Sequence, residues 1–112
     1  MNARRIPPMA SKVQKACRIK TQLSVILMKE GNNFIAYAPA LDFSTCGRTV
    51  AEAQRMFAEG VEIFLSECAK MGTLQDVLID CGWTRSSTPR PHLVPPEVIA
   101  DTRHEVEIPC PA

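Results

Sequence analysis

The sequence lacks any apolar run long enough to cross a membrane, and its aromatic content is only 5%. A membrane-spanning helix needs about 20 consecutive apolar residues. The first residues are basic, but Pro7 and Pro8 interrupt the short apolar stretch that follows, and a signal peptide needs a longer one. We therefore expect a cytoplasmic protein.

The sequence also lacks cysteine pairs with the spacing of a zinc site or a redox motif. Its five cysteines are odd in number and well separated, which favours reduced thiols over a disulfide framework. Cys68 has apolar neighbours at helical spacing, so we interpret it as a thiol packed in the core. No metal and no other cofactor is expected.

Groups suited to catalysis are equally scarce. Both histidines, His92 and His104, lie in a proline-rich segment, where a Ser–His or Cys–His pair would have to assemble from tail residues. No glycine-rich phosphate loop is present. Residues 18–29 contain no carboxylate, although a two-metal nuclease needs carboxylates clustered on its sheet. We therefore expect that the protein is not an enzyme.

The chain has the composition of one ordinary domain, since 46% hydrophobic residues in a chain of 112 leave room for a single core. We interpret residues 1–17 as a basic flexible leader and residues 18–83 as an α+β domain. Residues 84–112 hold six of the nine prolines and are interpreted as a tail. Charge is uneven: residues 1–30 hold seven Lys or Arg against one acid, and residues 31–82 hold three against seven.

Alternation of apolar and polar residues predicts three strands. Residues 18–28 alternate, and Ile26 and Met28 make the far end apolar on both faces, so we expect this end to be covered on both sides. A short turn leads to a strand over residues 34–38, which must pair antiparallel with the first because the connection is short. A third strand is predicted over residues 43–48.

Two helices are predicted to follow. Thr49 can cap the first helix, with Glu52 reaching back in a capping box, and Gly72 ends it. A stripe at steps of three and four packs this helix on the sheet and consists of Val50, Ala53, Phe57, Val61, Phe64 and Cys68. A second, short capped helix begins after Thr73 and ends before Gly82. The predicted class is therefore α+β: a three-stranded antiparallel sheet, one long packed helix and a short second helix.

The flank of the long helix is a candidate surface for a partner or for a second copy. Met56 and Ile63 are seven residues apart, beside Glu59 and Glu67. The two apolar residues can equally form the rim of the core, and the acidic residues can simply be solvated. An acidic helix face is also what a basic RNA-binding protein would dock against.

The two ends of the chain carry the other candidate sites. In residues 103–108, Val106 and Ile108 alternate with acidic residues, as in an edge strand that pairs either with the chain's own sheet or with a neighbouring chain. The basic N-terminal arm either forms a solvated leader or contacts nucleic acid. Its candidate residues are Arg4, Arg5, Lys12 and Lys15.

Two segments carry a resemblance to a known family. Residues 34–41, FIAYAPAL, and residues 47–53, GRTVAEA, are similar to the signature region of the HicB antitoxin family. The family pattern is an aromatic strand, a Pro-x-Leu step, a glycine and a Thr-x-x-Glu-Ala helix start. The residues that match it are Tyr37, Pro39, Leu41, Gly47, Thr49, Glu52 and Ala53. The resemblance covers residues 18–83.

The resemblance implies a degenerate ribonuclease-H-like half-fold without catalysis of its own. It also implies a protein partner, HicA, a small mRNA-cleaving toxin with a double-stranded-RNA-binding-like fold and a catalytic histidine. HicB proteins neutralise this toxin by covering its active surface, and they commonly assemble as dimers or tetramers, so a homo-oligomer is expected here.

Many HicB proteins continue into a helix-turn-helix or ribbon-helix-helix module that binds their operator. The proline-rich tail cannot supply such a module, so we do not expect direct DNA binding through one. The leading hypothesis is an antitoxin-like binding module. The alternative is a small nucleic-acid-binding or regulatory protein that uses the basic N-terminal arm.

Overall fold

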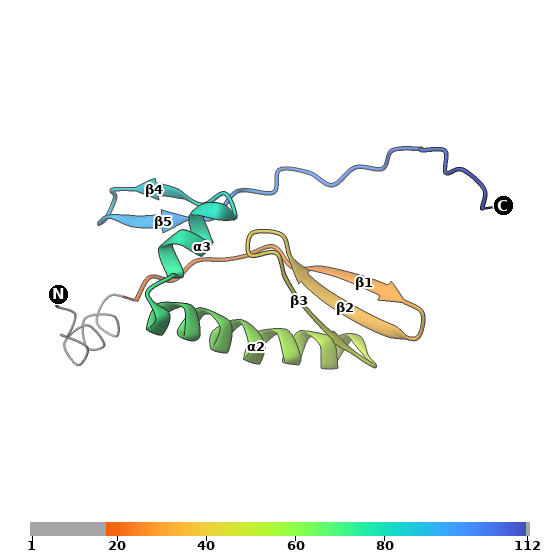
Figure 1. The fold of residues 1–112 in the computed structure, drawn as a ribbon, viewed down its shortest axis with the longest axis horizontal. Coiled ribbons are helices and arrows are strands. Elements are labelled where there is room, and N and C mark those ends of the chain that lie inside the picture. Colours follow the sequence, from red (N-terminus) through yellow and green to blue (C-terminus); the bar gives the residue numbers. More distant parts are fainter. Residues whose placement is uncertain (1–17, 112) are drawn as a thin grey trace.

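The computed structural model describes residues 18–111, which form a three-stranded sheet, two helices and a separate two-stranded hairpin (Figure 1). The elements follow in the order β1 (Ile26–Glu30), β2 (Asn33–Ala38), β3 (Phe43–Gly47), α2 (Val50–Met71), α3 (Leu74–Asp80), β4 (Thr84–Ser86) and β5 (His92–Val94). The predicted α+β class, a sheet followed by a long helix and a short one, is confirmed.

The sheet is antiparallel in the order β1-β2-β3, as the short connections predict. Its first strand is shorter than predicted, because the ladder to β2 begins only at Ile26, opposite Tyr37. β2 ends at Ala38, and the chain then turns, with the Leu41 N–H donating to the Ala38 carbonyl at 3.1 Å. Residues 18–24 therefore have no β2 residues opposite them, although their sequence alternates.

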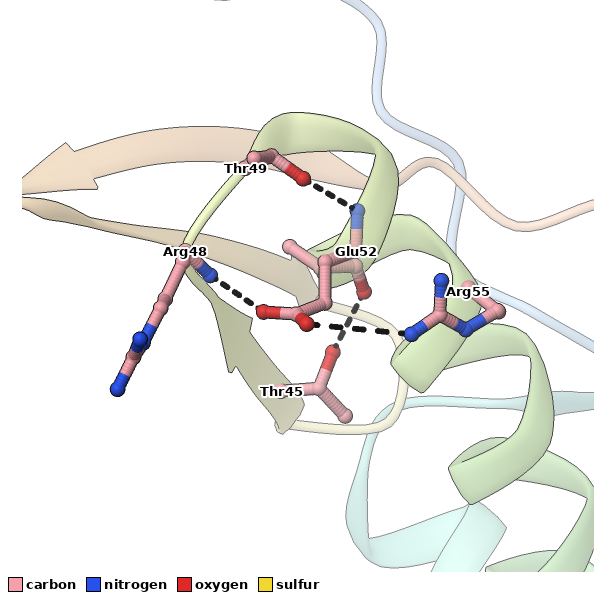
Figure 2. Close-up of polar contacts among 6 residues, drawn as sticks. Thr45, Arg48, Thr49, Glu52 and Arg55 are labelled. Atoms are coloured by element: carbon pink, nitrogen blue, oxygen red, sulfur yellow. Dashed lines mark hydrogen bonds and ion pairs between the residues drawn. The ribbon is translucent and has the colours of Figure 1, made fainter.

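α2 begins and ends at the residues that the sequence indicates. The Thr49 hydroxyl accepts a hydrogen bond from the Glu52 N–H at 3.0 Å, and Glu52 Oε1 accepts one from the Arg48 N–H at 2.6 Å (Figure 2). The Glu52 side chain thus reaches one residue further back than the predicted capping box. Gly72 ends the helix in the left-handed conformation, with φ 74°, and its N–H donates to the Ala69 carbonyl.

The first core cluster lies between α2 and the strands β2 and β3. Ala36 and Ala38 of β2 are fully buried and pack with Ala53 and Phe57 of α2. Small side chains on the strand allow the helix to lie close to the sheet. The centre of the predicted apolar stripe is therefore confirmed, whereas Val50 at its start is 40% exposed.

A second core cluster joins the turn after β2 to α3 and to the residues that follow it. Ala40 and Leu41 of the turn pack with Leu78 of α3 and with Trp83. The Trp83 indole N–H donates to the Ala40 carbonyl at 2.7 Å, so two buried polar groups satisfy each other. The second helix is therefore held by a contact between residues far apart in the sequence.

The start of α3 differs from the prediction of a side-chain cap. Thr73 forms no cap hydrogen bond to α3 through its side chain. Its hydroxyl donates instead to the Cys68 carbonyl at 3.3 Å, in the last turns of α2. Thr73 therefore stabilises the junction between the two helices rather than the start of the second one.

The proline-rich segment contains regular structure that the sequence did not predict. β4 and β5 pair antiparallel, with Arg85 opposite Leu93. Pro89 and Pro91 lie in the loop between these strands, where a missing N–H removes no ladder hydrogen bond. The only strand expected in this segment was the one near residues 103–108, so the hairpin within residues 84–94 was not predicted.

Candidate functional site

α2 presents a line of four predicted site residues on its surface, here called the α2 stripe: Met56, Glu59, Ile63 and Glu67. Steps of three and four residues keep these side chains on one side of the helix, and all four are exposed. Met56 is 43% exposed and Ile63 is 64% exposed, and neither packs against a core cluster. Both apolar side chains are therefore accessible to a partner, Ile63 more than Met56.

Negative charge dominates the α2 stripe. Glu67 pairs with Lys70 at 3.6 Å, but both side chains are more than half exposed, so this ion pair adds little stability. Glu59 forms no ion pair with any residue between 18 and 111. The stripe thus places two apolar side chains beside two carboxylates, the arrangement of a small apolar contact with a charged border.

The sheet has an open face on the side away from α2. Ala36 points toward α2, so its neighbours Ile35 and Tyr37 point the other way, together with their β1 partners Met28 and Ile26. Every residue of β1 is exposed. The expectation that this end of the strand is covered on both sides is therefore wrong, because α2 packs over β2 and β3 instead.

The residues that resemble the HicB signature lie mainly at the junction of β3 with α2. Gly47 is buried, and a Cβ at this position would lie 2.6 Å from the backbone nitrogen of Ala53. The Thr45 hydroxyl donates to the Ala53 carbonyl at 3.0 Å, one of the contacts drawn in Figure 2. Leu41 is only 3% exposed, in the second core cluster. Gly47 and Ala53 therefore position α2 on the sheet and are buried, as is Leu41, whereas the signature residue Thr49 is exposed.

Tyr37 is the signature residue that makes a polar contact on the open face. Its hydroxyl donates to Asp42 Oδ1 at 3.0 Å, and this hydrogen bond raises the pKa of Tyr37 above its ordinary value. Asp42 has φ 49°, in the left-handed region that Asp tolerates better than most residues. The pair spans the turn after β2, and sequence reasoning missed Asp42 because no local pattern marks its tertiary role.

The other predicted sites are not brought together with the α2 stripe. Val106 is 65% exposed and Ile108 is 81% exposed, and residues 103–108 form no strand with the chain's own sheet. Pairing of this segment with a neighbouring chain stays a prediction. The basic arm lies outside the described residues, together with its candidates Arg4, Arg5, Lys12 and Lys15.

The best-formed hollows in the described part of the chain are small. Two surface hollows have cavity volumes of about 120 Å³ each, whereas small-molecule sites typically have about 300 to 1,000 Å³. Among residues 18–111, no group of three or more His, Cys, Asp or Glu side chains could hold a metal ion. No helix in this part of the chain is long and apolar enough to cross a membrane. The candidate functional sites in the described part of the chain are therefore exposed surfaces and not pockets.

Comparison with known proteins identifies no relative: no protein-family model, no curated protein and no solved structure matches the chain. The α2 stripe and the open sheet face are thus inferred from this chain's own residues. Both surfaces expose apolar side chains on regular elements, which hold them in fixed positions.

Proposed function

We propose that this protein is an antitoxin-like binding module, which neutralises a HicA-type mRNA-cleaving toxin by covering the toxin's active surface. The observation that carries the proposal is the resemblance of residues 34–53 to the HicB signature, because the Pro-x-Leu step, the glycine and the Thr-x-x-Glu-Ala helix start occur there in the family's order. In this proposal the protein acts in the cytoplasm, as a dimer or tetramer, without cofactor and without catalysis of its own.

The α2 stripe is the surface that we assign to the toxin. An enzyme that cleaves mRNA binds a polyanion, so its active surface carries an excess of Lys and Arg. Glu59 and Glu67 offer the opposite charge, which speeds encounter and orients the partner. Along the helix, Ile63 lies between the two carboxylates and Met56 lies one turn before Glu59. These two side chains supply the apolar contacts that hold an interface together.

The direct test is co-expression with the short gene product encoded beside this protein. We expect that product alone to stop cell growth and to cleave mRNA, and we expect co-expression of both chains to restore growth. The two proteins should also co-purify. A neighbouring product that neither co-purifies with this protein nor is detoxified by it would contradict the proposal.

The charge of the α2 stripe gives a second prediction. Replacing Glu59 with lysine (E59K) is expected to weaken binding to that gene product by about tenfold, because a positive side chain would then face a basic surface. Isothermal titration calorimetry measures this change, and circular dichroism verifies that the variant is folded.

The matched control is E62K, since Glu62 is an exposed glutamate of the same helix that lies outside the stripe. Both substitutions change the net charge of the protein equally. E62K should therefore weaken binding clearly less than E59K, because Glu62 is one helical turn from Glu59 and shares its longer-range charge effect but not its contact. Equal losses in the two variants would place the partner on another surface.

A further inference from the structure

β1 is an edge strand whose apolar side chains are exposed in the described part of the chain. It pairs with β2 on one side only, and α2 packs over the other two strands. Ile26, Leu27 and Met28 are 44%, 40% and 44% exposed. An exposed apolar edge strand presents free backbone N–H and C=O groups, which a further strand can pair with.

The segment 103–108 has the sequence pattern of a strand but pairs with no strand in the described part of the chain. Every residue from 96 to 111 is exposed and belongs to no helix or strand. Val106 and Ile108 alternate with Glu105 and Glu107, which is the pattern of a strand with one apolar face. Both apolar side chains are largely exposed to water, at 65% and 81%.

β1 itself is neutral, with Lys29 beside Glu30, but the stretch that leads into it is basic, whereas the tail segment is acidic. Residues 18–29 contain Arg18, Lys20 and Lys29 and no acidic residue. Residues 97–108 contain four acidic residues against a single arginine, Arg103. The acidic tail segment is therefore attracted to the basic stretch before β1, whereas two copies of that stretch would repel each other.

The chain's own tail runs past its own β1. Val98 lines a shallow hollow together with Ser24, two residues before β1 begins. From Ser24, the strand β1 ends six residues later, at Glu30. An extended tail that starts beside Ser24 at Val98 covers the same length in six residues and has then reached His104. In Figure 1 the tail runs in the same direction as β1, and its end lies beyond the β1–β2 turn. Residues 105–108 therefore lie beyond the end of their own β1 and are not beside it to pair with it.

We propose that residues 103–108 of one copy add as a strand to the β1 edge of a second copy, and that the exchange is reciprocal. Each sheet then gains a fourth strand, the β1 backbone groups gain partners, and the apolar side chains of both segments leave water. This surface differs from the α2 stripe, and the inference does not rest on the proposed antitoxin function.

The test compares two substitutions in the full chain, I108D and I99D. Ile108 and Ile99 are both exposed tail isoleucines, at 81% and 88%, but only Ile108 lies in the proposed strand. The original protein should sediment as a dimer or larger assembly at micromolar concentration. I108D should weaken this assembly by about tenfold or more, because a charge replaces an apolar contact, whereas I99D should leave it within about twofold.

Amide hydrogen exchange locates the contact. We expect amides of β1 to become protected as the concentration of the original protein rises, and this protection should be absent in I108D. A protein that stays monomeric, an assembly that survives I108D, or equal losses in both variants would each overturn the inference. Protection of β1 that does not depend on concentration would also overturn it, because the tail would then pair within its own chain.

Discussion

Gly47 shows at the scale of one residue how closely the long helix lies on the sheet. A methyl group at this position would meet the Ala53 backbone nitrogen at 2.6 Å and the Glu52 Cβ at 2.9 Å. The backbone at the start of α2 would therefore have to shift. We expect G47A to lower the free energy of unfolding by about 1 to 3 kcal/mol, as overpacking of a rigid site does. Urea denaturation measures this loss.

G60A is the matched control for this prediction. A methyl group at Gly60 would lie 3.2 Å from the Phe43 Cζ atom, which belongs to a side chain and not to the backbone. Alanine also favours the helix by about 1 kcal/mol relative to glycine, which offsets the tight contact. G60A should therefore stay within about 1 kcal/mol of the original stability. A larger loss for G60A than for G47A would contradict this account of the two contacts.

At the scale of elements, α2 depends on the cap at its first turn. The Thr49 hydroxyl accepts the Glu52 N–H at 3.0 Å, and no other side chain is seen to accept from this N–H among the described residues. T49A is expected to lower the free energy of unfolding by about 1 kcal/mol, the usual cost of losing an N-cap hydroxyl. T49S keeps the hydroxyl and should preserve most of this stability in the same urea titration. Equal losses in T49A and T49S would show that the hydrogen bond is not responsible.

At the scale of the whole molecule, the two core clusters form one folding unit because they share side chains. Phe43 and Val61 pack against both clusters. Trp83, the only tryptophan, reports on the second cluster, whereas far-UV circular dichroism reports mainly on α2. We expect Trp83 fluorescence and circular dichroism to give the same urea midpoint, as a two-state domain does. Two separate midpoints would show that the clusters unfold independently.

Local sequence patterns determined the elements whose causes are local. Thr49 and Gly72 mark the ends of α2 because capping and the left-handed conformation depend only on neighbouring residues. The hairpin of β1 and β2 follows from the short connection between two apolar strands. These features were sufficient to predict the α+β class and the order of the elements from β1 to α3, but not the hairpin of β4 and β5.

Tertiary structure alone decided which residues find a partner and which stay exposed. The alternation of residues 18–24 is that of a strand, yet β2 ends at Ala38 and leaves them without a partner strand. The alternation of residues 103–108 likewise forms no strand within the chain, whereas residues 84–94 form a hairpin despite their prolines. Strand pairing and cover by α2 are contacts between distant segments, so the exposed β1 edge and the α2 stripe emerge only when the whole chain is folded.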